Sequence, residues 1–211
     1  TPLALAATLA LGAASASAQE VVRWGIPMSF GSNLTALGDT MPWVSEHLKM
    51  ISGGTVNLQV FEPGKLVPAL GIFDAVSSGK VEAGYSFMGY EQGKVPVSAI
   101  FGALPFGMET PQFAAWIYFG GGDALLKETF KPHNVYPILC GSISPEAAGW
   151  FRKEIKTPDD LKGLKFRAAA LGGKIYQKLG ASVTVLPGGE LFQALEKGVL
   201  DGTEFSLPTV D

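Results

Sequence analysis

Strand-like and helix-like segments alternate in the early part of the chain, and this alternation restricts the fold more than any other feature. Short apolar or alternating runs predict three strands, over residues 21–27, 55–63 and 81–87. Apolar residues at helical spacing predict helices over residues 33–52 and 66–79, and Pro42 should kink or divide the first of them. This order of elements implies a parallel sheet with right-handed crossovers.

The rest of the chain continues the alternation. Two helices are predicted over residues 112–119 and 123–130, separated by glycines at 120–122. Further strands are predicted over residues 134–140, 149–155, 164–168, 182–187 and 203–208, and further helices over residues 171–181 and 188–198. Thr157 and Asp160 are expected to cap one helical turn that Gly163 ends. The predicted fold class is α/β throughout.

One internal match links the two halves. Residues 73–84 (FDAVSSGKVEAG) and 192–203 (FQALEKGVLDGT) share an amphipathic helix that is closed by glycine and leads into a strand. The match is explained either by shared helix-ending chemistry or by two similarly built lobes. In the second case, the facing strand ends of the lobes would form a cleft.

Composition and motifs exclude several classes of function. The chain is 47% hydrophobic and carries a net charge of -3 with no basic run, so no nucleic-acid partner is expected. A single cysteine, Cys140, and two histidines, His47 and His133, rule out a disulfide framework and a Cys/His zinc site. Nucleophile-elbow, zinc-protease and phosphate-loop motifs are also absent from the sequence, which argues against an enzyme.

The first 18 residues are expected to be a signal peptide that is incomplete at its start. An apolar run from Leu3 to Ala14 is followed by small residues that end in Ala16, Ser17 and Ala18, which is typical of a secretory cleavage site. The predicted mature protein begins at Gln19 and lies outside the cytoplasm.

Charged side chains at predicted strand ends are the remaining candidates for a site. Arg167 ends a predicted strand, where open α/β sheets bind ligands, and its planar guanidinium suits a carboxylate. Glu146 lies in a loop, and Glu204 belongs to the last predicted strand. Two carboxylates near one arginine would also suit a hard cation.

Several stretches resemble the solute-binding proteins of tripartite ATP-independent periplasmic (TRAP) transporters, the DctP-type family. Residues 149–208 resemble the second-lobe segment of that family, and residues 61–87 and 104–122 resemble the first lobe. The resemblance covers residues 20–211, and the run over 140–151 points to the branch that binds 2-oxo acids such as pyruvate.

The resemblance implies a periplasmic protein of the type II periplasmic-binding-protein kind, with two α/β lobes and a ligand cleft between them. Such a protein captures a small organic acid, here a 2-oxo or 2-hydroxy monocarboxylate, and delivers it to the TRAP membrane permease without acting as an enzyme. Arg167 occupies the place of the arginine that forms a salt bridge with the ligand carboxylate in this family.

The same resemblance implies a metal cation bound together with the ligand. In the 2-oxo-acid branch a glutamine, a glutamate and the carbonyl of a following tryptophan hold the cation. Glu204 matches the glutamate, whereas Glu146 stands in place of the glutamine and Phe205 in place of the tryptophan. The extra negative charge of Glu146 favours calcium over sodium, or else a different ligand.

Phe30 and Phe87 match first-lobe positions at the cleft. Each is interpreted either as packing on the apolar part of the ligand or as an ordinary core aromatic.

The expected division is lobe I over residues 19–141, part of lobe II over residues 142–204, and a strand that returns to lobe I over residues 205–211. Members of the resembled family continue further, with a tail by which the 2-oxo-acid branch dimerises. A longer protein would then be able to form a homodimer.

Two other functions remain open from the sequence. A secreted metal-dependent enzyme could use Glu146 and Glu204 around a catalytic cation. A sensor could use the same ligand-bound lobes to signal to a kinase or chemoreceptor. We predict a transport protein that binds its ligand by hinge closure.

Overall fold

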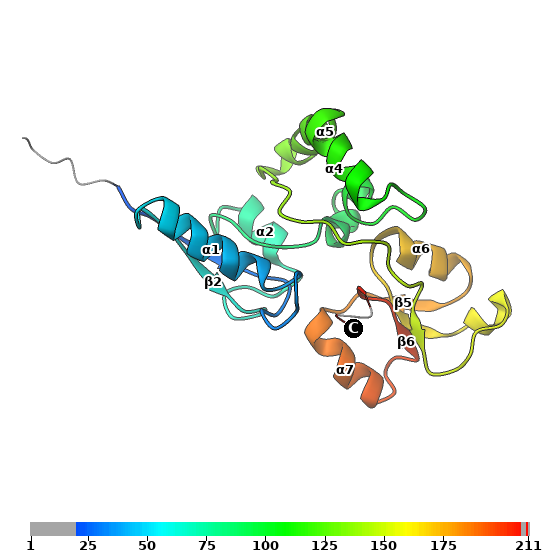
Figure 1. Ribbon diagram of the computed structural model, residues 1–211. Coiled ribbons are helices and arrows are strands. Elements are labelled where there is room, and N and C mark those ends of the chain that lie inside the picture. The colour runs from blue at the N-terminus through cyan, green and yellow to red at the C-terminus, as the bar shows by residue number, and fades with distance from the viewer. Residues whose placement is uncertain (1–19, 208–209, 211) are drawn as a thin grey trace, which may run out of the picture.

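The computed structural model describes residues 20–207 and residue 210, and the predicted signal peptide lies outside these residues. In Figure 1 the elements of the first half, blue to green, form one group, and those from α6 onward, yellow to red, form another beside it. No helix within the described residues is long and apolar enough to cross a membrane.

A small parallel sheet forms the base of the first lobe. Strand β1 (Val22–Pro27) pairs in parallel with β2 (Val56–Phe61), as the alternation predicts. The predicted third strand is reduced to a bridge between Met28 and Tyr85. Only this short stretch pairs because the chain turns at once into a 3-10 helix, η1 (Met88–Gly93). The residues after β1 and after the bridge therefore lie at one edge of the sheet.

The prediction that Pro42 kinks or divides a helix is wrong. Helix α1 (Thr40–Ile51) begins only two residues before the proline, so Pro42 lies in its first turn. The first-turn N–H groups have no partner within a helix, and the missing N–H of proline therefore costs nothing there. Residues 33–39, predicted to be helical, form mainly turns.

The turns before α1 include Ala36, an exposed residue with a φ of 60°. A left-handed backbone disfavours every residue with a Cβ, so Ala36→Gly should raise the free energy of unfolding by about 1 kcal/mol. Ala124→Gly, the same change at an exposed position inside helix α5, should lower it by about as much. Urea unfolding of both variants measures the two effects, and a loss of stability in Ala36→Gly would contradict the assigned backbone.

The internal match corresponds to one helix-ending geometry used twice. Helices α2 (Ile72–Ser77) and α7 (Gly188–Glu196) are followed by Gly79 and Gly198, and each glycine has a φ of 71°. The segments that follow differ, because the first leads to the single bridge and the second to strand β6 (Gly202–Thr203).

Helices α3 (Ala99–Gly102), α4 (Thr110–Phe119) and α5 (Gly122–Phe130) cover the rest of the first half, together with the 3-10 helices η2 (Pro96–Ser98) and η3 (Lys131–His133). Gly121, with a φ of 87°, separates α4 from α5 as predicted. Their apolar faces, together with Phe73 of α2 and with Val95, form a core whose other members are Phe101, Ile117, Leu126 and Phe130. Residues 134–140 are not the predicted strand, because Val135 and Leu139 pack on this core while the backbone joins no ladder in the described chain.

The second lobe contains a mixed sheet in the order β3-β6-β4-β5. Strand β4 (Lys165–Arg167) lies parallel to β5 (Ser182–Thr184) and β6, and β3 (Trp150–Phe151) runs antiparallel to β6. Helix α6 (Ala170–Lys178) follows β4 directly, and the predicted capped turn is present as η4 (Pro158–Leu161) with a capping box. Strands β3 and β6 are shorter than predicted.

Phe166 is the centre of the second-lobe core. Its side chain is fully buried and lies between the rings of Phe151 and Tyr176, at centroid distances of 5.1 and 4.4 Å. Since side chains alternate across a strand, burying Phe166 on one face turns its neighbour Arg167 to the other.

Candidate functional site

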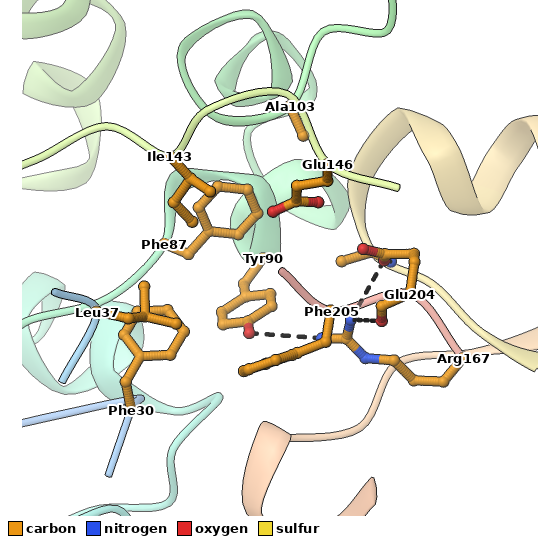
Figure 2. A pocket seen from close by; sticks show the side chains of 11 residues that line it. Phe30, Leu37, Phe87, Tyr90, Ala103, Ile143, Glu146, Arg167, Glu204 and Phe205 are labelled. Carbon is orange, nitrogen blue, oxygen red and sulfur yellow. Dashed lines mark hydrogen bonds and ion pairs between the residues drawn. The ribbon is translucent and has the colours of Figure 1, made fainter. Parts of the chain in front are cut away.

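A pocket lies between the two lobes, at the ends of β1, β4 and β6. Its free space, counted together with the open solvent at its mouth, is about 370 Å³. Figure 2 shows the side chains that line it, which are Phe30, Leu37, Phe87, Tyr90, Ala103, Ile143, Glu146, Arg167, Ala169, Glu204 and Phe205. All six residues predicted for the ligand and cation sites therefore line one pocket.

Arg167 is the most deeply buried charge at this site, with 1% of its surface exposed. Its Nε donates to the carbonyl oxygen of Leu186 at 3.1 Å. Its Nη1 donates to the carbonyl oxygen of Glu204 at 2.6 Å and to the carboxylate Oε1 of Glu204 at 3.2 Å. These bonds compensate the cost of burying the guanidinium and fix its orientation.

Glu204 follows β6 and is held from two directions. The backbone N–H of Ala169 donates to its Oε1 at 2.7 Å. Its own backbone N–H donates to the carbonyl oxygen of Arg167 at 3.0 Å, which continues the ladder between β6 and β4. Neighbouring strands therefore place one cation and one carboxylate at the same strand ends.

Aromatic side chains form one wall of the pocket. The ring of Phe205 lies 5.2 Å from the guanidinium carbon of Arg167, a cation–π arrangement. Phe30 faces this ring at a centroid distance of 6.4 Å. Phe87 packs edge to face on Tyr90 at 5.3 Å. Phe30 and Phe87 thus line the pocket and also pack within the fold.

Glu146 is the second carboxylate of the pocket. It belongs to the irregular segment between the lobes, is exposed, and turns its carboxylate toward the pocket in Figure 2. The described residues contain no group of three or more His, Cys, Asp or Glu side chains placed to hold a metal ion. A cation here would therefore need backbone or ligand oxygens in addition to Glu146 and Glu204.

Sequence reasoning missed Tyr90, Leu37 and Ile143. Tyr90 lies in η1, and its hydroxyl oxygen is 3.5 Å from Nη2 of Arg167. Burial raises the pKa of Tyr90 above its usual value, and the Arg167 charge opposes that rise only in part. The available signal was position, since Tyr90 follows the same predicted strand end as Phe87.

Comparison with known proteins matches most of the chain to one family. The family described as bacterial extracellular solute-binding protein, family 7 (DctP) matches residues 30–211. A monocarboxylate 2-oxoacid-binding periplasmic protein of Nostoc sp. is 39% identical over 191 residues, which are 90% of this chain and 52% of that protein.

Two crystal structures show the same similarity in three dimensions. One is a TRAP periplasmic solute-binding protein of Pseudoalteromonas atlantica with bound sodium and pyruvate, which is 38% identical in sequence. It superposes with a TM-score of 0.87, and the match covers 91% of this chain and 58% of the Pseudoalteromonas chain. A TRAP solute-binding protein of Bordetella bronchiseptica, a dimer with calcium and picolinate, is 33% identical, with a TM-score of 0.86 over 89% and 56%. The chain thus spans a little over half the length of the proteins it matches.

Proposed function

This chain belongs to the DctP family of bacterial extracellular solute-binding proteins, and on that basis we propose that it captures a small organic acid for a TRAP transporter. The observation that supports this most is the buried Arg167 in a pocket between two lobes. The protein would act in the periplasm and deliver its ligand to the membrane permease.

The ligand would be a 2-oxo or 2-hydroxy monocarboxylate. Arg167 attracts the carboxylate, and the rings of Phe30 and Phe205 offer an apolar surface to the short carbon chain. Binding between two lobes favours the closed arrangement, since the ligand contacts both lobes only there.

A cation fits the donor set of the pocket. Arg167, Glu146 and Glu204 together carry a formal charge of -1, and a bound monocarboxylate makes it -2. A calcium ion would neutralise this charge, whereas a sodium ion would leave a net charge of about -1 in the pocket. The carboxylates of Glu146 and Glu204 and the carbonyl of Phe205 would hold the ion, which supplies positive charge for the acid's oxygens.

Glu146→Gln should weaken the calcium requirement of acid binding. Removing one of the two carboxylates lowers the charge that selects a divalent ion, so the calcium concentration for half-maximal binding should rise about tenfold. The measurement is pyruvate binding after chelation, titrated with calcium and separately with sodium.

Glu154→Gln removes an exposed carboxylate outside the pocket and should leave both titrations unchanged. An unchanged calcium titration in Glu146→Gln would contradict a cation-binding role for Glu146.

The relatives are solute-binding proteins of transporters, and we propose that this chain likewise makes and breaks no bond. A metal-dependent enzyme would convert the acid, so incubation with candidate acids and calcium followed by product analysis separates the two functions. A purely sensory role would instead require signalling to a kinase or chemoreceptor.

A thermal-shift screen of the protein from its complete gene tests the proposed function. It should include 2-oxo, 2-hydroxy and aromatic acids, each with calcium, with sodium and after chelation. An acid at about 100 times its Kd should stabilise the protein by about 2.7 kcal/mol. No shift with any acid under any condition would contradict the proposal.

A further inference from the structure

We propose that Glu91 makes the first lobe sensitive to pH. A proton on its buried carboxyl keeps η1 packed, and ionisation loosens this helix and the pocket wall that it provides. The effect on acid binding rests on the proposed function, whereas the loosening of η1 does not. The burial of Glu91, the charges that face it and the residues that η1 contributes to the pocket support this role.

Glu91 is a buried carboxyl without a close cation. Its side chain belongs to η1 and is only 6% exposed. The Nζ atom of Lys94 lies 3.9 Å from its Oε2, which is too far for a direct hydrogen bond. Among the described residues, no other cation lies within 4.0 Å of this carboxylate, and no group donates a hydrogen bond to it. A carboxylate buried in this way loses the solvation of its charge with little in return.

Lys94 is held by a different carboxylate. Its Nζ lies 2.7 Å from Oδ2 of Asp74 on α2, and this pair is well exposed to solvent. The elements that pack most closely on η1 are η2, α3 and α6. The first two carry no charged side chain, and the two lysines of α6, Lys174 and Lys178, are exposed. The charges that face Glu91 are therefore one shared ammonium and the carboxylate that holds it.

These surroundings favour the protonated form of Glu91. Burial raises the pKa of its carboxyl from 4.5 to about 7, while Lys94 opposes this rise and Asp74 adds to it. Where η1 opens, water reaches the carboxyl and its pKa returns toward 4.5. The packed helix therefore binds the proton more tightly than the open one does. Packing of η1 is then most favourable below pH 4.5 and loses stability as the pH rises to about 7.

The loss of stability would reach the pocket through η1 itself. The backbone carbonyl of Glu91 accepts the N–H groups of Lys94 and Val95 at 2.9 and 2.7 Å, and these bonds close the end of the helix. Phe87 and Tyr90, which come just before Glu91, line the pocket (Figure 2). A molecule in which η1 is open lacks this wall, so the apparent Kd for the acid rises as the open fraction grows.

Amide hydrogen exchange of the ligand-free protein, made from its complete gene, tests the loosening of η1. Glu91→Gln replaces the carboxyl by a neutral amide of the same shape, so residues 88–95 of this variant provide the reference at each pH. Relative to this reference, the protection of the same residues in the wild type should fall about tenfold between about pH 6 and about pH 8.5. Glu128→Gln removes an exposed carboxylate of α5 and should behave as the wild type does.

Lys94→Met provides a second test that does not depend on the Glu91 variant. Removing the ammonium takes away the charge that lowers the pKa of Glu91, so the loss of protection should occur at higher pH than in the wild type. Two results would overturn the proposal. One is a ratio of protection between wild type and Glu91→Gln that is the same at both pH values, and the other is a midpoint that Lys94→Met leaves in place.

Calorimetric titration with pyruvate in the presence of calcium tests the effect on binding. Pyruvate stays ionised over this range of pH, and its Kd should rise at least about threefold more in the wild type than in Glu91→Gln. Equal rises in the two proteins would overturn the link between Glu91 and the pocket. Failure of the wild type to bind any 2-oxo or 2-hydroxy acid at either pH would contradict the proposed function, while hydrogen exchange would still decide whether η1 loosens.

Discussion

Arg167→Ala is expected to abolish acid binding and to lower the free energy of unfolding by about 3–5 kcal/mol. Removal of the guanidinium takes away the charge that attracts the ligand. It also leaves the Glu204 carboxylate, 15% exposed, without its arginine partner at 3.2 Å. The Leu186 carbonyl loses a donor at the same time.

Calorimetry with pyruvate and urea unfolding measure the two effects. Arg152→Ala removes an exposed arginine of the same lobe and should change neither the affinity for pyruvate nor the free energy of unfolding markedly. Among the described residues, its side chain makes a single hydrogen bond, to the Leu200 carbonyl at 3.3 Å. Arg167→Lys keeps the positive charge but loses the three hydrogen bonds that the guanidinium donates to Leu186 and Glu204. Compared with Arg167→Ala, it should therefore recover part of the stability and little of the affinity for the acid. Acid binding of normal affinity in Arg167→Ala would contradict the role of Arg167.

Phe166→Ala should destabilise the second lobe by about 3–5 kcal/mol. The side chain is 0% exposed and packs between Phe151 and Tyr176, so its removal leaves a cavity in the centre of the lobe. The next residue in β4 is Arg167, and a loosened strand would misplace its guanidinium. Acid binding should therefore weaken as well.

Urea unfolding followed by pyruvate titration below the transition measures this effect. Phe192→Ala is the matched control, because Phe192 is 74% exposed on α7 and its loss should cost well under 1 kcal/mol. Equal stabilities of the two variants would contradict the assignment of Phe166 as the core of the lobe.

The alternation of strands and helices could be predicted from sequence because each segment carries its own periodicity. Strand β1, helix α5 and the capped turn at η4 all follow from local patterns. The lengths of the strands and the pairings between them depended instead on the segments that pack beside them. The segment over residues 134–140 has strand-like composition, yet its apolar side chains pack on helices and its backbone finds no partner strand among the described residues.

The candidate site was predictable where a residue stands at a strand end. Side chains alternate between the two faces of β4, so Phe166 in the core implies that Arg167 lies on the opposite face. Tyr90 had only its position after the predicted strand end as a signal, because its approach to Arg167 depends on a 3-10 helix that packs against the other lobe. The commitment of three Arg167 donors to backbone and carboxylate oxygens likewise depends on Leu186 and Glu204, which lie far from it along the chain.

A crystal structure of the protein from its complete gene, grown with pyruvate and calcium, tests the central claim most directly. We predict an acid between the lobes, with one carboxylate oxygen at hydrogen-bond distance from the guanidinium of Arg167 and a cation contacting Glu146 and Glu204. Pyruvate bound away from Arg167, or a pocket that stays empty at saturating acid and calcium, would contradict the account.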